Sequence, residues 1–381
     1  MSGIFIHEGI KRRLRSVGKI LSLPGRLPRW WKSRSVQHKE IKLIEGGAFN
    51  KLVIFFIPEN RGVTGGTLQI FSLYRMTKDF LKGTGGDALI CWLPDEGWDI
   101  HKFEGFENDV IIFPLEMVLN ACHPGCEIMF HVPEYAAERF CESVGWGRLK
   151  LLRERRLLKI NILNQNIEVM PGRNFIDRLK VVFPDLCCTV GNPAWETDEE
   201  KCRLNIPIHT IPTWYYPDDA PRQPYESKKD ILIVSPDLNS YRELVLDAIR
   251  RSLPDLDIRV VYGLKYERYL ELERTAKWSL TFGEGLDGYF YGPVLRGGVA
   301  FAVRNGTFNL PGLEDLRTVY PSYEMMAEKI VEDICTLDTK DAYERYNAIV
   351  RNPLVCVLGR DRTSRALEKF YRDRWSLTVI G

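Results

Sequence analysis

The feature that most constrains this chain is an apolar run at 51–57, KLVIFFI, with a glycine-containing segment shortly after it. The run is rich in β-branched and aromatic residues and shows no polar alternation, which is typical of a strand buried on both faces of a parallel sheet. The segment at 61–66, RGVTGG, then leads into a stretch of helical periodicity at 67–82. A buried strand, a glycine loop and a helix in this order predict a layered α/β structure.

The same alternation runs along most of the chain and is interrupted once. Between 210 and 229 four prolines and many polar residues predict an extended connector. We expect strands at 88–93, 109–113, 127–131 and 158–163 before it, and at 230–235, 257–262, 278–282 and 300–304 after it. The fold class is therefore α/β, with two Rossmann-like parallel-sheet domains facing a cleft. The expected domains are 41–212 and 230–362, with a linker at 213–229 and a C-terminal helix at 363–381 that returns to the first domain.

Composition excludes several other classes. Of the 381 residues, 45% are hydrophobic and 27% charged, enough apolar surface to offset the entropy of ordering the chain. No apolar run reaches the length that spans a bilayer, and no secretory leader pattern follows Met1. The nine cysteines form no Cys-x-x-Cys pair, so we expect reduced thiols in a cytoplasmic protein. Cys187–Cys188 and Cys122-His123 with Cys126 lack the paired spacing of a closed zinc site, and we predict no metal.

The charge is distributed unevenly. Residues 1–39 carry ten basic side chains and one acid, Glu8, a formal +9; because the whole chain is +2, the remainder is −7. Apolar residues at helical spacing lie between these cations, and Trp30–Trp31 follows a proline-containing segment. Such an arm, taken as residues 1–40, is suited to an anionic membrane surface. A solvated tail or partner-binding arm is the alternative. Nucleic acid is not expected, because no basic and aromatic platform continues into the body.

Two glycine-containing loops are candidate binding sites. The first comprises Gly62, Thr64, Gly65 and Gly66, where free N–H groups at a helix N-terminus attract phosphate or a sugar hydroxyl; a tight strand-to-helix turn is the alternative. The second is the segment 281–293, TFGEGLDGYFYGP. In this segment the carboxylate of Glu284 lies between two glycines at the end of a buried strand, a position that packing does not explain well. It is explained if the carboxylate binds two hydroxyl groups of a ribose.

The two-unit plan with these loops resembles bacterial glycosyltransferases of the GT-B fold, of the type that builds surface polysaccharide such as O-antigen or capsule. The resemblance covers roughly 48–375. It rests on the glycine loop at 61–66, on Ile211-Pro212-Thr213 and on the stretch from Glu284 to Pro293 and beyond. The second acid of the family's pattern has no counterpart, because Arg296 occupies the corresponding stretch. This leaves the donor and the stereochemistry open.

The resemblance implies a metal-independent transferase with no cofactor, which moves a hexosyl or deoxyhexosyl group from a nucleotide sugar to a lipid-linked or growing glycan at the inner face of the plasma membrane. Arg242 and Lys265 would bind the diphosphate, with a solvated surface position as the alternative for each. The donor-binding stretch would be Glu284, Gly285, Leu286, Asp287 and Gly288. If the reaction inverts, a base in the first domain must take the acceptor proton, and His131 and Glu134 are the candidates. For His131 a structural role is the alternative.

Two other functions are compatible with the same pattern. A sugar-nucleotide epimerase would share the two-domain fold but would need neither an acceptor nor a basic arm. A non-catalytic glycan- or nucleotide-binding protein would show neither donor hydrolysis nor transfer.

Overall fold

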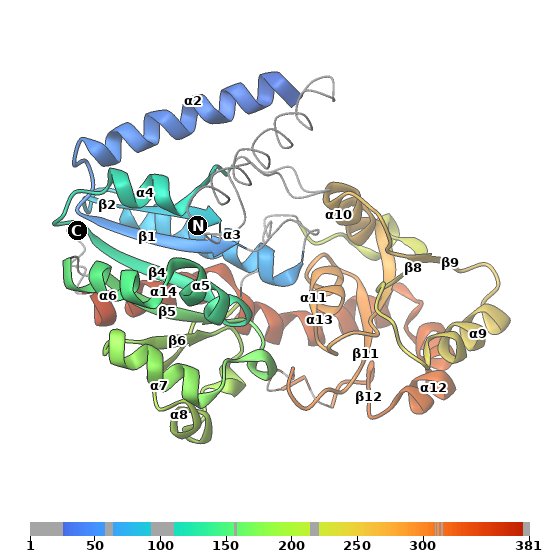
Figure 1. Cartoon of the computed structure of the whole chain (residues 1–381). Helices are drawn as coiled ribbons and strands as arrows, with labels where there is room; N and C mark the ends of the chain where they lie inside the picture. Colours follow the sequence, from blue (N-terminus) through green and yellow to red (C-terminus); the bar gives the residue numbers. More distant parts are fainter. Residues whose placement is uncertain are drawn as a thin grey trace, which may run out of the picture.

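The computed structural model describes residues 26–57, 64–92, 110–155, 158–213, 221–308, 310, 312–313 and 315–375. The glycine loop residue Gly62 and most of the basic arm lie outside these ranges. The described chain forms two units, each built on a parallel sheet with helices on both faces (Figure 1). The expectation of two Rossmann-like parallel-sheet units is confirmed.

In the described part of the first unit, seven strands pair in parallel in the order β3-β2-β1-β4-β5-β6-β7. The strands are β1 (Lys51–Ile57), β2 (Gly86–Trp92), β3 (Ile112–Phe113), β4 (Glu127–Pro133), β5 (Leu158–Asn164), β6 (Cys187–Val190) and β7 (Ile208–Thr210). The helices are α2 (Arg26–Glu45), α3 (Gly65–Leu81), α4 (Leu115–Ala121), α5 (Ala137–Val144), α6 (Trp146–Arg155), α7 (Arg173–Val182) and α8 (Asp198–Leu204), with 3-10 turns η1 (Glu134–Ala136), η2 (Ile167–Val169) and η3 (Pro193–Trp195).

The apolar run of β1 explains why this sheet is covered on both sides. Leu52, Ile54 and Phe56 enter a core with residues of α2 and α4 to α8, whereas Val53, Phe55 and Ile57 enter a second core with α3 and α14. All six side chains are fully buried. Each side chain of this size contributes about 1.5–3 kcal/mol by leaving water, so β1 is a central stabilising element of the unit.

In the described part of the second unit, five parallel strands follow the order β12-β11-β10-β8-β9. They are β8 (Lys229–Val234), β9 (Asp257–Val260), β10 (Ala276–Leu280), β11 (Val299–Val303) and β12 (Val319–Tyr320). The helices are α9 (Arg242–Ser252), α10 (Tyr266–Thr275), α11 (Gly288–Leu295), α12 (Tyr323–Leu337), α13 (Lys340–Leu358) and α14 (Arg360–Trp375), and the turn η4 (Tyr225–Ser227) precedes β8. α9, α11, α12 and α13 share its larger core.

The last helix lies on the first unit. α13 packs in the core of the second unit, but Leu367, Phe370 and Tyr371 of α14 are buried beside α3. At the crossing, the Thr363 hydroxyl donates to the carbonyl of Pro212, 2.9 Å away. The described residues that border the connector and the last helix, Pro212 and Thr363, are therefore in contact.

The basic segment ends in a helix that belongs to the first unit. α2 runs through residue 40, where the arm was expected to end, and Pro28 lies in its first turn, where proline is tolerated. Gln37 is buried and donates to the carbonyl of Ile112 at 2.6 Å, and Ile41 and Ile44 join the core. Within the described ranges no helix is both long enough and apolar enough to cross a membrane.

Candidate functional site at the junction of the two units

Loops at the carboxyl ends of both sheets meet in one place, called the junction below. The Asn166 amide donates to Glu284 Oε1 at 3.4 Å, at the long end of the hydrogen-bond range. The Thr307 hydroxyl donates to Glu168 Oε1 at 2.7 Å, and the Trp195 indole donates to the carbonyl of Thr307 at 2.7 Å. Open α/β sheets bind ligands outside the carboxyl ends of their strands, so the junction is the candidate site.

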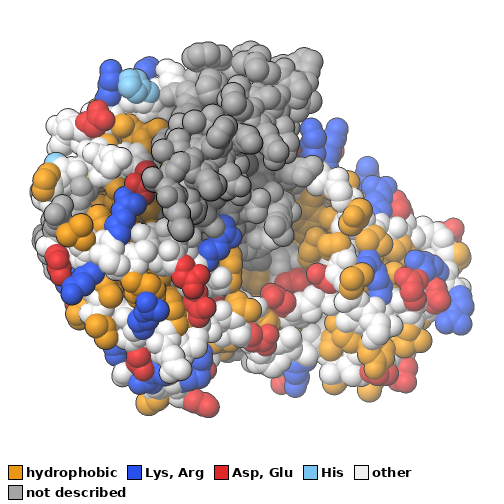
Figure 2. Space-filling model, in the orientation of Figure 1, with side chains coloured by type: hydrophobic (Ala, Val, Ile, Leu, Met, Phe, Trp, Pro, Cys, Tyr) orange, Lys and Arg blue, Asp and Glu red, His pale blue; other side chains and the backbone are white. Residues whose placement is uncertain are grey.

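The described surface near the junction is acidic. Figure 2 shows several acidic side chains where the two units meet on the face in view. Glu168 comes from the first unit, and Asp237 and Glu284 come from the second. The charges of Asp237 and Glu168 add to the effect of burial, the larger cause, in raising the pKa of Glu284. Each additional negative charge in this space therefore raises the cost of ionising Glu284.

Glu134 is the first-unit residue with the chemistry expected of a base. It follows β4 directly, is 2% exposed, and accepts the backbone N–H of Asn166 on Oε1 at 2.9 Å. Its Oε2 is buried and has no hydrogen-bond partner among the described atoms. Burial raises the pKa of Glu134 to about 7, against the opposing effect of backbone N–H groups. A carboxyl that titrates near neutral pH and keeps one oxygen unoccupied can accept or donate a proton.

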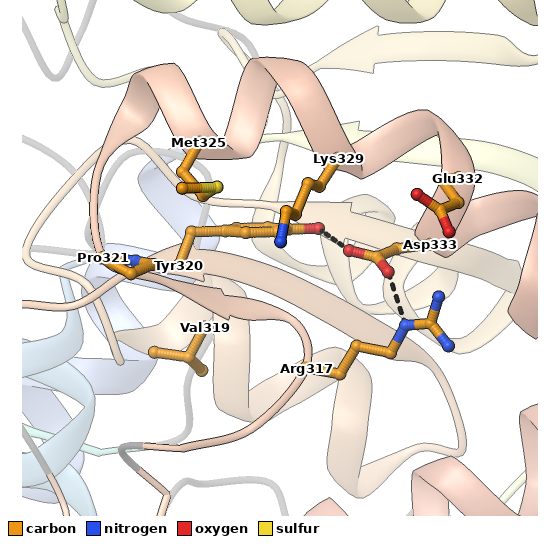
Figure 3. Close-up of a pocket in the computed structure, with 8 residues that line it drawn as sticks. All are labelled: Arg317, Val319, Tyr320, Pro321, Met325, Lys329, Glu332 and Asp333. Atoms are coloured by element: carbon orange, nitrogen blue, oxygen red, sulfur yellow. Dashed lines mark hydrogen bonds and ion pairs between the residues drawn. The ribbon is translucent and has the colours of Figure 1, made fainter.

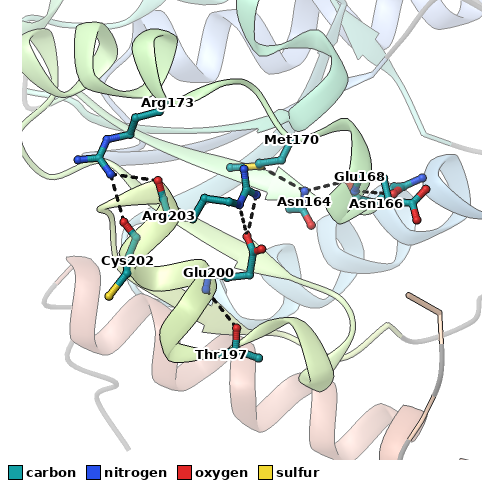
Figure 4. A network of polar contacts seen from close by, with 9 residues as sticks. All are labelled: Asn164, Asn166, Glu168, Met170, Arg173, Thr197, Glu200, Cys202 and Arg203. Carbon is teal, nitrogen blue, oxygen red and sulfur yellow. Dashed lines mark hydrogen bonds and ion pairs between the residues drawn. The ribbon is translucent and has the colours of Figure 1, made fainter. Parts of the chain in front are cut away.

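Asn166 connects several residues in this part of the site (Figure 4). The sequence analysis did not identify it as a site residue. Its carbonyl accepts from the Asn164 amide at 3.1 Å, and its side-chain oxygen accepts from the backbone N–H of Glu168 at 2.9 Å. Its own amide is left to reach Glu284. The polar run after β5 was the available signal, because polar residues directly after a buried strand are poorly explained by packing.

His131, a candidate base, has the environment of a structural histidine. It is 1% exposed and lies within β4, which extends to Pro133, so its side chain points into the sheet–helix core. Nδ1 pairs with the Asn161 amide at 2.8 Å and Nε2 with the Tyr371 hydroxyl at 3.0 Å, while the ring stacks on Phe55. Burial lowers the pKa of His131 to about 3. Both nitrogens are occupied within the core.

Glu284 lies in the loop after β10 and is exposed toward the junction. Gly285 follows it with φ +86°, and a Cβ there would lie 2.9 Å from Asn305 Cβ and 3.0 Å from the Val303 carbonyl. Only glycine suits both the left-handed backbone and this close approach. The glycine thus turns the chain so that the preceding carboxylate faces outward, which gives it a positioning role.

The rest of the predicted donor stretch has structural contacts within the second unit. Asp287 caps α11: Oδ1 accepts from the N–H groups of Tyr289 and Phe290, and Oδ2 accepts from the Thr281 hydroxyl at 2.7 Å. Burial raises the pKa of Asp287 to about 7. Leu286 is buried in the core of the second unit, and Gly288 begins α11. The carboxylate therefore occupies N–H groups that could otherwise bind an anion.

The two predicted phosphate-binding cations are placed differently. The Arg242 guanidinium donates to the carbonyls of Ser235 and Asp237 at 3.0 Å each, so it holds the loop after β8. Lys265 is exposed at the start of α10. Asp237 was not singled out by the sequence; with Asp287 it flanks Gly283, where a Cβ would come within 2.8 Å and 2.9 Å of their carboxylates.

The described part of the first glycine loop is fixed by packing. Thr64 caps α3 by accepting from the N–H of Thr67 at 3.2 Å, and Gly65 begins the helix. A Cβ on Gly66 would lie 2.6 Å from Gln165 Oε1, and the Gln165 amide donates to the Gly66 carbonyl at 2.7 Å. Gly66 thus lies against the Gln165 side chain, which connects α3 to the segment after β5.

A separate open pocket of about 380 Å³ lies between β12 and α12, at the far edge of the second sheet (Figure 3). Arg317 and Tyr320 both donate to the Asp333 carboxylate there, at 2.5 Å and 2.6 Å, so its buried charge is already balanced. None of the residues predicted from the sequence lines it. Across the described ranges, no three His, Cys, Asp or Glu side chains are grouped as metal ligands would be.

Comparison with solved structures identifies the architecture. Sucrose-phosphate synthase from Thermosynechococcus elongatus superposes with a TM-score of 0.55 at 11% identity, covering 86% of this chain and 100% of that chain. The chain has the GT-B fold. The Anabaena protein HepE, solved with UDP-glucose, gives a TM-score of 0.52 at 11% identity over 84% of this chain and 99% of that one. A putative UDP-N-acetylglucosamine 2-epimerase from Listeria monocytogenes gives 0.51 at 10% identity, over 86% and 98%.

At these identities the likeness concerns the fold. No protein-family model matches the sequence, and no curated protein matches it. The activity must therefore be argued from the junction itself.

Proposed function

We propose that this protein is a metal-independent glycosyltransferase that moves a hexosyl or deoxyhexosyl group from a nucleotide sugar to a lipid-linked or growing surface glycan. The observation that carries the proposal is the meeting of Glu134 and Glu284 around Asn166 at the carboxyl ends of both sheets. Two solved structures with this fold are a sugar-phosphate synthase and a protein with bound UDP-glucose, which supports a nucleotide-sugar donor.

The roles follow from the two environments. Glu284, exposed in the loop after β10, suits hydroxyl groups of the donor, because an ionised carboxylate accepts hydrogen bonds and donates none. Glu134 suits the acceptor. In an inverting reaction its carboxylate takes the proton of the acceptor hydroxyl as that oxygen bonds to the anomeric carbon, and the nucleoside diphosphate leaves with the electron pair of the broken bond.

A panel of nucleoside diphosphates tests the donor part. A ligand that binds only the folded protein raises its unfolding free energy by about 2.7 kcal/mol at one hundred times its dissociation constant, which thermal unfolding resolves. We expect one base to stabilise the protein, in EDTA as well as without it, and Glu284→Ala to weaken the effect of the matching nucleotide sugar. No stabilisation by any nucleotide would contradict the proposal.

We also propose that the protein works at the inner face of the plasma membrane, held by its basic segment. The support is the charge of +9 on residues 1–39 against −7 on the rest. Each Lys or Arg close to an anionic leaflet contributes about 1 kcal/mol.

A sugar-nucleotide epimerase is the second candidate, and its support is the similar fold of the Listeria protein. The two activities separate cleanly. An epimerase forms an isomerised nucleotide sugar when it is incubated with a nucleotide sugar alone. A transferase instead needs the acceptor, and it releases nucleoside diphosphate in proportion to the acceptor that is glycosylated.

A further inference from the structure

The Glu134–Asn166 hydrogen bond connects the segments that follow β4 and β5, and each segment carries an exposed side chain with apolar surface. Tyr135, in η1, is 49% exposed, and Val169, in η2, is 48% exposed. The other two residues of η1, Glu134 and Ala136, are buried, whereas no residue of η2 is. An exposed aromatic side chain directly beside a buried, titratable carboxyl is not required by packing.

Tyr135 directly follows Glu134 in η1 and is only partly exposed. Burial and then the charge of Glu134 raise the pKa of the Tyr135 phenol, although half of the side chain is exposed. Tyr135 is therefore close to Glu134, and the exposed half of its side chain remains for contact from outside. Aromatic rings are rigid and amphipathic, and their electron-rich faces attract the positively polarised C–H groups of a sugar ring.

The surrounding charge limits what can bind there. Glu134, Glu168 and Glu284 all contribute carboxyl groups to the junction, and the charge of Glu168 already raises the pKa of Glu284. A negatively charged acceptor group placed beside Glu134 meets the like charge that Glu134 carries as a base. Hydroxyl and amino groups are hydrogen-bond donors to the same carboxylates.

We propose that Tyr135 binds the acceptor, and that the acceptor presents there an uncharged or amine-bearing pyranose and not an acidic sugar or a terminal phosphate. This rests on the proposed function and narrows its acceptor class. The pyranose packs its C–H face on the Tyr135 ring beside Val169. One of its hydroxyl groups then lies within reach of Glu134, the group that accepts its proton.

Saturation-transfer NMR tests this without a known donor. The probes are the methyl pyranosides of glucose, galactose, glucosamine and glucuronic acid, with a short-chain prenyl phosphate, each measured with and without UDP. We expect a saturation-transfer signal from one or more of the first three pyranosides. This signal should fall at least about fivefold in Tyr135→Ala and should be retained in Tyr135→Phe. Tyr262→Ala is the matched control, because Tyr262 is 86% exposed on the connection after β9. Matching thermal unfolding curves establish that the variants fold.

Three results would overturn the inference: no signal from any pyranoside with the wild-type chain, undiminished signals in Tyr135→Ala, or preferred binding of the glucuronide or the prenyl phosphate. Failure of the proposed function has a different signature. In that case the nucleotide panel would give no stabilisation, whatever the pyranosides do.

Discussion

Glu134 and Glu284 come from different sheets, yet both accept a hydrogen bond from Asn166, one from its backbone N–H at 2.9 Å and one from its side-chain amide at 3.4 Å. One residue thus connects a buried carboxyl that titrates near neutral pH with an exposed carboxylate of the opposite unit. In the proposed reaction the first serves the acceptor and the second the donor, so the relative position of the units sets the distance between the two substrates.

Replacing Glu134 with Gln should lower the rate of transfer by about 10²–10⁴-fold if it is the general base, because the amide cannot take a proton. In the wild-type enzyme the rate should rise with pH through about 7, where the carboxylate forms. Rates measured from pH 5.5 to 9 test both points. Glu138→Gln, on the exposed side of α5, is the control. A variant with the wild-type rate and profile would exclude Glu134 as the base.

The same group should make stability depend on pH. Because the pKa of Glu134 is raised from 4.5 to about 7 in the folded state, the folded protein holds the proton more tightly than the unfolded chain. Its contribution is fully present below pH 4.5 and is lost as the pH rises through 7, by about 3 kcal/mol at most. The free energy of unfolding in urea should therefore fall between pH 4.5 and 7.5 in the wild type relative to Glu134→Gln. If the two proteins show the same dependence of unfolding free energy on pH, the assignment is contradicted.

Replacing Glu284 with Ala should reduce transfer by about 10²-fold or more while leaving the thermal transition almost unchanged, because the side chain is exposed and its one hydrogen bond is long. Glu271→Ala, on the exposed face of α10, provides the comparison. Steady-state rates with the donor identified by the nucleotide panel provide the measurement. If Glu284→Ala had normal activity, Glu284 would not be a donor-binding residue.

Tyr371→Phe should destabilise the protein without a specific effect on chemistry. The phenol contacts both the Thr77 hydroxyl and His131 Nε2, each at 3.0 Å, and its removal leaves buried polar atoms without a partner, a loss of about 1–3 kcal/mol. His131→Ala should destabilise too, and the double variant should lose less than the sum. Urea unfolding and the rate per folded molecule measure this. If His131→Ala lost most of its transfer rate while keeping the stability of the wild type, His131 would have a role in the reaction.

Deleting residues 1–25 should weaken sedimentation with anionic vesicles while leaving the fold intact. This removes five of the ten cations and retains α2, whose Gln37 donates to Ile112. A longer deletion, through residue 39, would also remove the contact between Gln37 and Ile112 and lower the stability of the protein. A loss of vesicle binding could then no longer be attributed to the basic residues alone. Neutral vesicles serve as the control. If the shortened chain sediments as strongly as the full one, the segment is not the anchor.

Much of the fold could be predicted because the central strands carry a strong local signal. KLVIFFI gave the bounds of β1, since every residue after Lys51 is apolar and buried. β6 and β12, with four and two residues, are too short for periodicity to show. α2 was not predicted because its proline was taken as a break, although proline is tolerated in a first turn.

The site was harder to predict because roles depend on where a strand ends. β4 extends two residues beyond the predicted end, which puts His131 inside the core and Glu134 at the junction. Asp287 and Glu284 are three positions apart in one glycine-rich stretch, but only the structure shows that one caps α11 and the other faces outward. Gly285 is explained by its left-handed backbone, a requirement that the sequence cannot separate from ligand contact.

The position of α14 has a consequence for how the protein is made. Leu367, Phe370 and Tyr371 cover one face of the first sheet, but the ribosome adds them only after the whole second unit. During synthesis that face, including Phe55 and Ile57, has no partner from α14, and an exposed apolar sheet face favours association with other chains. The first unit to be translated is thus the last to be completed, and a nascent chain stalled before residue 363 should depend on chaperones far more than the finished protein.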